Sequence, residues 1–269
     1  MPELRILTKK SYINKFQKII KKIADKLTDY LNDPNEENIH DIRIAIRRLE
    51  AAYEILPKVI RKKPNLQNYV EQATLLFKIN TEIRDFDIIT RKLDQHFSNL
   101  ISGLISSIMT KRKSKIRDAL IIASKLRSSS LPKITEKHVS EPKLRKRFRK
   151  IVNKLNLRIK QNIPIVLNDE KKIDELHRLR KDFKKLRYTL ELTLENKRMP
   201  SYIENLKKVQ DTLGEIHDSD IMLEYLKNHR KINNINDIIK QEIIERNVKY
   251  KLFVKTFSEQ KFGLEKLIC

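Results

Sequence analysis

The chain has 269 residues, and its 59 lysines and arginines outnumber its 35 aspartates and glutamates, which gives a formal net charge of +24. This excess favours a polyanionic partner such as nucleic acid, an inorganic phosphate polymer or an anionic membrane; a solvated surface is the alternative. No apolar run is long enough to span a membrane, and the single cysteine, Cys269, excludes an internal disulfide and a cysteine-based zinc site. We therefore expect a cytoplasmic protein without a membrane partner.

Apolar residues recur three and four positions apart through almost the whole chain, which predicts an all-α fold. In the first half, the expected helices cover 8–31, 36–61, 65–82, 86–98 and 100–127. Pro34 and Pro64 separate the first three, because proline cannot continue a helix interior. The polar, proline-bearing segment 131–142 is the expected joint between a first helical-bundle half, 1–130, and a second, 143–269.

The second half has the same organisation, with expected helices at 143–163, 169–197, 201–214, 218–230 and 234–262. Asp85 and Asp218 stand where a new helix is expected to begin, so we interpret them as N-caps. Asp87 and Asp220 then fall in the first turn, where negative charge suits the helix dipole. Each half is expected to be an antiparallel, four-helix-bundle-like unit.

A basic histidine motif occurs twice in the chain. Residues 39–54 read IHDIRIAIRRLEAAYE and residues 176–191 read LHRLRKDFKKLRYTLE, so the histidine, the basic residues and a final glutamate recur in register. A second repeated pair follows in the same order, TEIRDFDI at 81–88 and GEIHDSDI at 214–221. These repeats indicate an internal duplication, and we expect the two halves to be related by pseudo-two-fold symmetry.

The two faces of the histidine motif differ in chemistry. The expected core stripes are Ile42, Ile46, Leu49, Tyr53 and Leu56 in the first copy, and Leu179, Phe183, Leu186 and Leu190 in the second. The opposite face carries a histidine followed by basic residues in both copies. Guanidinium groups bind phosphate oxygens in bidentate fashion, and lysine adds a point charge. A histidine beside several phosphates should be protonated near neutral pH and donate a further hydrogen bond.

Four stretches of the chain together resemble the CHAD domain, the conserved histidine α-helical domain. They read NIHDIRIAIRRL, EIRDFDI, LHRLRKDFKKLRY and LKKVQDTLGEIHDSDI, they follow the family's order, and the resemblance extends over roughly residues 8–265. The resemblance implies two four-helix bundles around a central basic groove and a role in binding inorganic polyphosphate. It also implies work alongside a separate phosphate-handling enzyme, with polyphosphate granules as a possible location in the cytoplasm.

The resemblance also implies which residues bind polyphosphate. His40 and His177 match the family's namesake histidines, and Arg84 matches the arginine of the Arg-Asp-x-Asp motif. The second half departs from the first, because His217 replaces that arginine and Arg187 has an acidic counterpart. No catalytic residue, metal or cofactor is expected. The expected binding residues are His40, Arg43, Arg47, Arg48, Arg84, His177, Arg180, Lys184, Lys185, Arg187 and His217.

Other functions remain open at the level of sequence. Nucleic acid or another polyanion is an alternative ligand that would bind in a salt-dependent way, and an acidic protein docked on a scaffold is another. A metal-dependent bundle enzyme is a third, because Glu37 and His40, like Asp174 and His177, have the i,i+3 spacing of diiron carboxylate ligands. Those histidines, however, lie opposite the apolar stripe. A phosphatase would need a nucleophile, a carboxylate cluster or a phosphate loop, and the sequence shows none, so we expect a non-catalytic protein.

Overall fold

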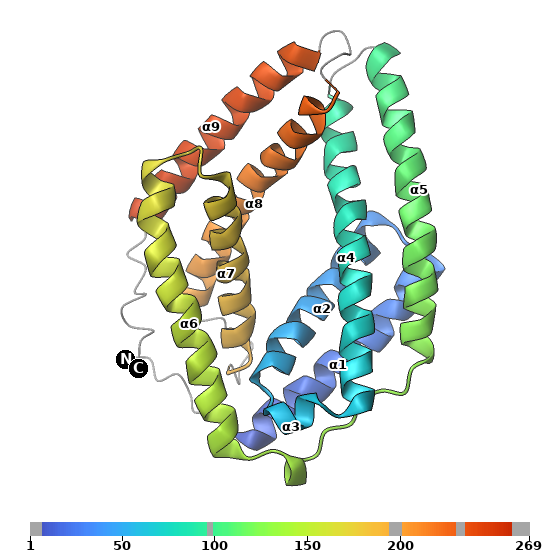
Figure 1. Cartoon of the computed structure of the whole chain (residues 1–269), viewed down its shortest axis with the longest axis vertical. Helices are drawn as coiled ribbons and strands as arrows, with labels where there is room; N and C mark the ends of the chain where they lie inside the picture. The colour runs from blue at the N-terminus through green and yellow to red at the C-terminus, as the bar shows by residue number, and fades with distance from the viewer. Residues whose placement is uncertain (1–6, 96–98, 194–200, 230–234, 260–269) are drawn as a thin grey trace.

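The computed structural model describes residues 7–95, 99–193, 201–229 and 235–259, and every regular element within these ranges is a helix (Figure 1). The all-α fold expected from the apolar spacing is confirmed. In chain order the elements are α1 (Lys9–Asn32), α2 (Glu36–Ile55), α3 (Lys58–Arg61), α4 (Pro64–Leu93), α5 (Asn99–Ser128), the 3-10 helix η1 (Glu136–His138), α6 (Glu141–Asn168), α7 (Ile173–Glu191), α8 (Ser201–Lys227) and α9 (Ile235–Glu259).

Helices that follow one another in the chain pack together in pairs. The pairs are α1 with α2, α4 with α5, α6 with α7, and α8 with α9, and α2 also packs on α4 and α7 on α8. In Figure 1 the α4–α5 pair stands on one side of the molecule, and the α6–α7 and α8–α9 pairs stand on the other. Contacts between α2 and α7 and between α4 and α8 join the first half of the chain to the second. No helix among the described residues is long and apolar enough to cross a membrane.

Buried apolar side chains connect the two halves into one interior. A large cluster draws residues from both halves, so they share a core, and a smaller one joins the far ends of α4, α5, α8 and α9. The expected core stripes are confirmed at most positions: Leu49 on α2 and Phe183 on α7, for example, have 0% exposure. Tyr53 is the exception, because it is half-buried and its hydroxyl donates to the Arg61 carbonyl over 2.9 Å.

Several expected helix boundaries are wrong. The helix expected over 36–61 is interrupted, since α2 ends at Ile55 and Pro57 precedes the short α3. The helices expected at 65–82 and 86–98 are one continuous helix, α4, and those at 201–214 and 218–230 are likewise continuous within α8. Asp85 and Asp218 are therefore interior helical residues, and their interpretation as N-caps is wrong. The ends expected at 96–98, 194–197 and 260–262 lie outside the described residues.

Two of the four aspartates, Asp87 and Asp220, have tertiary partners on neighbouring helices. An aspartate inside a helix costs at most about 0.7 kcal/mol relative to alanine, which packing readily offsets. Asp87 accepts from Arg112 on α5 over 2.5 Å, and Asp220 accepts from Arg246 on α9 over the same distance. These carboxylates therefore hold neighbouring helices together rather than beginning new ones.

Candidate anion-binding site

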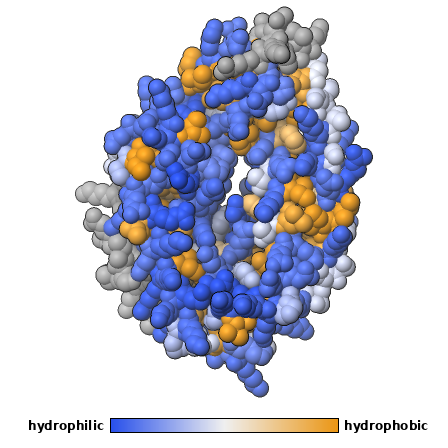
Figure 2. Space-filling model, in the orientation of Figure 1, coloured by the Kyte–Doolittle hydropathy of each residue, from blue (hydrophilic) through white to orange (hydrophobic). Residues whose placement is uncertain are grey.

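The two histidine motifs meet near the middle of the molecule. One copy lies on α2 and the other on α7, and α2 and α7 are in contact. Figure 2 shows an opening through the molecule with a largely hydrophilic rim, which lies between α4 and the α7–α8 side of Figure 1. The charged side chains that influence one another here form what we call the central cluster: His40, Arg43 and Arg47 on α2, Arg84 and Asp85 on α4, His177, Arg180 and Lys184 on α7, and His217 and Asp218 on α8.

The cations of the central cluster are crowded and partly removed from water. Burial, together with the nearby charges of Arg84, Arg47 and Arg180 and in spite of that of Asp85, lowers the pKa of Arg43 to about 10. The pKa of Lys184 falls to about 7 for the same reasons, burial first and then the neighbouring arginines. Like charges are therefore held together here at a cost in free energy, which an anion bound among them would offset.

Most of these cations lack a counter-ion in direct contact. The Nε atoms of Arg43 and Arg180 are buried and have no hydrogen-bond partner among the described residues. Arg43 makes one long contact through Nη2 to the Thr81 hydroxyl, at 3.5 Å. Arg47 lies over the Phe77 ring at 3.9 Å from its centroid and donates to Glu50 over 3.1 Å. The hydrogen-bonding capacity of Arg43 and Arg180 is thus left largely open.

The histidines of the cluster are neutral at neutral pH in the unliganded protein. Burial, followed by nearby cations, lowers the pKa of His177 to about 4 and that of His217 to about 2. The pKa of His40 is lowered as well, by burial first and then by Arg84. The Nδ1 atoms of His177 and His217 are 3.1 Å apart, so one must donate to the other. The expectation that a bound phosphate protonates these histidines stays a prediction.

Two carboxylates lie within this cationic cluster. Asp85 is surrounded by the charges of Arg43, Asp218 and Arg180, and Asp218 by those of Arg180, Arg84 and Lys184. Burial raises the pKa of both carboxyl groups, that of Asp85 to about 6. Sequence reasoning missed both residues as part of the site. The sequence did contain a signal for them: an aspartate directly follows the repeated basic position, which is Arg84 in the first half and His217 in the second.

Three of the expected binding residues are engaged elsewhere, two of them at the α2–α7 interface and one between α7 and α8. Arg48 on α2 pairs with Glu191 on α7 at 3.2 Å, and Lys185 on α7 pairs with Glu54 on α2 at 2.5 Å. Arg187 is buried and donates to Gln210 over 2.9 Å and to Glu191 over 3.0 Å. Their hydrogen bonds are used within the fold, so we leave Arg48, Lys185 and Arg187 out of the proposed ligand contacts.

Arg84 is also engaged, although at the edge of the cluster. It pairs with Glu36 in the first turn of α2, and Glu36 also pairs with Arg91 at 3.3 Å. Glu36 is half exposed, with 51% of its side chain accessible, so water weakens its ion pair with Arg84. A bound anion would therefore compete with Glu36 for Arg84. Arg84 therefore stays among the candidate contacts as a residue that exchanges one anionic partner for another.

The geometry expected of a diiron centre does not occur. Glu37 and Asp174 are exposed rather than directed into a bundle core. Within the described ranges, no three His, Cys, Asp or Glu side chains are grouped as metal ligands. The neighbouring Arg43 and Arg84 would in addition repel a dication. The residues present thus suit an anion better than a metal.

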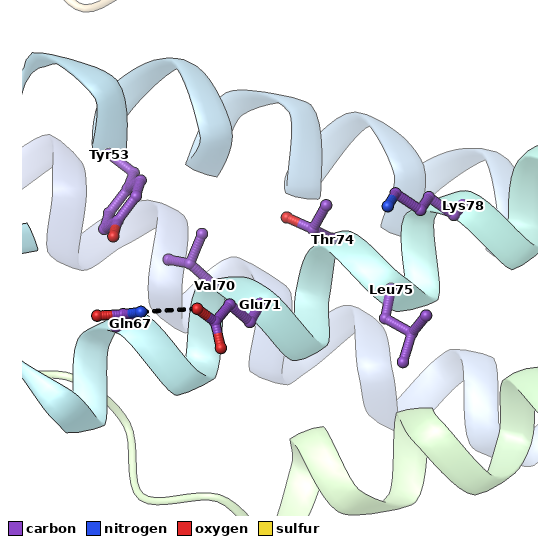
Figure 3. Close-up of a pocket in the computed structure, with 7 residues that line it drawn as sticks. All are labelled: Tyr53, Gln67, Val70, Glu71, Thr74, Leu75 and Lys78. Atoms are coloured by element: carbon purple, nitrogen blue, oxygen red, sulfur yellow. Dashed lines mark hydrogen bonds between the residues drawn. The ribbon is translucent and has the colours of Figure 1, made fainter. Parts of the chain in front are cut away.

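A surface pocket of about 410 Å³ lies apart from the charged residues of the cluster, beside the amino-terminal half of α4. Figure 3 shows the side chains that line it, with Gln67 donating to Glu71. Among the lining residues Lys78 is the only cation, and Glu71 opposes it, so the pocket does not favour a polyanion. Its lining residues are Tyr53, Gln67, Val70, Glu71, Thr74, Leu75 and Lys78.

Comparison with known proteins agrees with the arrangement of these helices. The crystal structure of the CHAD domain from the plant Ricinus communis is similar over 96% of this chain and 89% of that chain, with a TM-score of 0.59 and 14% sequence identity. A likeness at that identity shows a shared fold alone. No curated protein matches the chain. The family model of the CHAD domain matches residues 15–227, which include both histidine motifs, and the chain therefore belongs to the CHAD domain family.

Proposed function

We propose that the protein binds inorganic polyphosphate at the central cluster and catalyses no reaction on it. The observation that carries the proposal is the set of cations without a counter-ion: within the described residues, neither Arg180 nor Lys184 forms an ion pair or a hydrogen bond. A chain of phosphates would offer each of them a charge-assisted hydrogen bond, which is stronger than one between neutral groups. Every repeat unit of such a polymer carries the same acceptor oxygens, so no further recognition is needed.

We also infer that the two halves are four-helix-bundle units related by an approximate two-fold axis, so that both present equivalent surfaces to the ligand. Reciprocal contacts support this relation. The Arg48–Glu191 pair across the α2–α7 interface has its counterpart in Lys185–Glu54, with the roles of the two halves exchanged. The Asp87–Arg112 pair likewise has a counterpart in Asp220–Arg246, at the same distance of 2.5 Å.

Polyphosphate suits the cluster better than nucleic acid does. Non-specific binding of single strands uses aromatic side chains on which bases stack. Two aromatic rings beside the histidine motifs are not free for stacking, because Arg47 covers Phe77 and Tyr188 is buried. Nucleic acid and an acidic protein partner stay as alternatives that the same experiment distinguishes. A cytoplasmic location beside a separate phosphate-handling enzyme fits this ligand and is part of the proposal.

The test is calorimetric titration of the full chain with long-chain polyphosphate at near-physiological salt, with duplex DNA and RNA as comparison ligands. The informative variant is Arg43→Gln with Arg180→Gln, which removes two central charges without adding a clash. Arg117→Gln with Arg149→Gln is the matched control, since both arginines are exposed and lie outside the cluster. At about 1.5–3 kcal/mol for each charge-assisted bond, the central variant should weaken binding by about a hundredfold or more.

The salt dependence of binding gives a second readout. The slope of log K against log salt reports the number of phosphate charges neutralised, so the central variant should reduce that slope by about two. Equal losses in the central and control variants would replace the site with a diffuse basic surface. Nucleic acid binding as tightly as polyphosphate would make the protein a general polyanion binder, and no binding to any of the three would favour an acidic protein partner.

A further inference from the structure

The two carboxylates of the central cluster have no evident structural role. Asp85 comes from α4 and Asp218 from α8, one from each copy of the repeat; these two helices are in contact, and the charge of Asp218 acts on Asp85. Within the part of the chain that the structure describes, neither forms an ion pair or a hydrogen bond, although arginines surround both. The adjacent repeated aspartates, Asp87 and Asp220, are by contrast paired directly with arginines. Asp85 and Asp218 therefore lie among cations without being paired to any of them by direct contact.

The surroundings of the carboxylate pair come from four helices. Arg43 on α2 and Arg180 on α7 face Asp85, together with Glu82 from its own helix. Arg180 and Lys184 on α7 face Asp218, together with Arg84 and Arg91 on α4. An anion that occupied the space among these cations would lie close to both carboxylates. Repulsion between the bound anion and the carboxylates would favour the protonated, neutral form of the carboxyl groups.

We propose that Asp85 and Asp218 are the proton acceptors of this site, and that binding of polyphosphate at the central cluster transfers a proton from solvent onto this pair. The inference rests on the proposed function. No other bond changes: a buffer acid gives up the proton, and one carboxylate oxygen receives it. The pair thus acts as an internal anion, which partly balances the cluster when it is empty and loses its charge when the ligand arrives.

The state of the free protein supports these acceptors over the histidines. Burial raises the pKa of Asp85 to about 6, so this carboxyl group is mostly ionised at pH 7 and needs only a small further rise to bind a proton. Burial raises the pKa of Asp218 as well. His177 and His217, with pKa values of about 4 and 2, need a far larger rise. Protonation of both rings would also set two N–H donors against each other across the 3.1 Å contact.

Lys184 is the competing proton acceptor, and the pH separates its contribution from that of the carboxylates. Its pKa is about 7, so the free protein already carries most of that proton below this pH, and uptake by Lys184 occurs above it. Asp85, by contrast, takes up a proton above about pH 6, because at lower pH it is already protonated before the ligand binds. Proton uptake near pH 6.5 is therefore the signature of the pair.

The test is calorimetric titration of the full chain with long-chain polyphosphate, repeated in buffers of different ionisation enthalpy, which yields the number of protons taken up. We expect the wild-type protein to take up about one proton at about pH 6.5. Asp85→Asn with Asp218→Asn should lose at least half of that uptake and bind about tenfold more tightly at about pH 7.5, because the repulsion is gone. Asp211→Asn is the matched control on α8, since Asp211 is exposed and outside the cluster.

The outcomes separate this inference from the proposed function. Absence of any polyphosphate binding by the wild-type protein would overturn the proposed function itself. Tight binding without proton uptake, or uptake that is unchanged in the Asp85→Asn, Asp218→Asn variant, would overturn this inference alone. Asparagine has nearly the shape of aspartate and breaks no direct ion pair here, so the variant is expected to fold; each single variant should give an intermediate uptake and confirm the assignment.

Discussion

Replacing Lys184 by methionine should make the protein more stable and a poorer ligand binder. The ammonium group lies among Arg180, Arg43 and Arg47, and burial together with these charges lowers its pKa from 10.5 to about 7. Methionine keeps the length and apolar character of the lysine stem but removes the charge. The variant therefore relieves the repulsion between the ammonium group and these arginines.

The size of the gain follows from the pKa shift. One pKa unit corresponds to about 1.4 kcal/mol, so the shift of Lys184 sets an upper bound of roughly 4–5 kcal/mol. Solvent and bound ions screen a partly buried group, and we expect about 2 kcal/mol at pH 7. A lysine whose pKa falls on folding destabilises the native state below the folded pKa, and the penalty disappears as the pH rises from about 7 to 10.5. The stabilisation by Lys184→Met should shrink over that window.

Thermal unfolding followed by helical circular dichroism is the suitable assay, because the chain has no tryptophan for fluorescence. For a chain of this size about 2 kcal/mol raises Tm by about 4–8 °C, measured in a buffer without phosphate or sulfate. Lys207→Met is the control, since Lys207 is exposed on α8 and should leave Tm nearly unchanged. A Tm for Lys184→Met at or below that of the wild type, or a gain that does not change between pH 7 and 10, would refute the reasoning.

Two further predictions concern contacts that hold the helices together. Glu54→Lys places a cation against Lys185 and should lower the free energy of unfolding by about 1 kcal/mol. Adding Lys185→Glu should recover most of that loss. A double variant as unstable as the single one would show that the pair is not specific. Asp220→Asn leaves the buried Arg246 without its counter-ion and should cost about 3 kcal/mol in urea denaturation at pH 7, and a loss below about 1 kcal/mol would remove its structural role.

The faces of the histidine motifs were predictable because angular position on a helix depends only on spacing. Leu49 and Phe183 are fully buried, as their stripes predict, and Arg43 and Arg180 lie on the polar side of the same helices. The continuity of α4 and α8 was not predictable in this way. The preference of aspartate for a helix start is worth about 1 kcal/mol, which is less than the packing gained by extending the helix through Asp85.

The partners of individual cations could not be predicted from the sequence, because a helical projection does not say which neighbouring helix covers a residue. Arg187 has the same residue type as Arg180 and lies seven positions later in the same motif. Its guanidinium is nevertheless buried against Gln210 and Glu191, whereas that of Arg180 has no partner among the described residues. The sequence repeat therefore identifies the two helix faces that carry the candidate site. Tertiary contacts decide which of the cations on these faces lack a protein partner.

Pairing, rather than the number of positive charges, separates the structural cations from the candidate ligand contacts. Arg48 and Lys185 are matched with acids across the α2–α7 interface, and such pairs fix the spacing of the two motifs. Arg43, Arg180 and Lys184 belong to the same two motifs, but no acid pairs with them by direct contact among the described residues, and burial lowers their pKa values. A fold that needed only solubility would leave such cations in water, where they cost nothing. Their partial burial at a shared centre is the physical reason to assign them to an anion that both halves of the chain would bind.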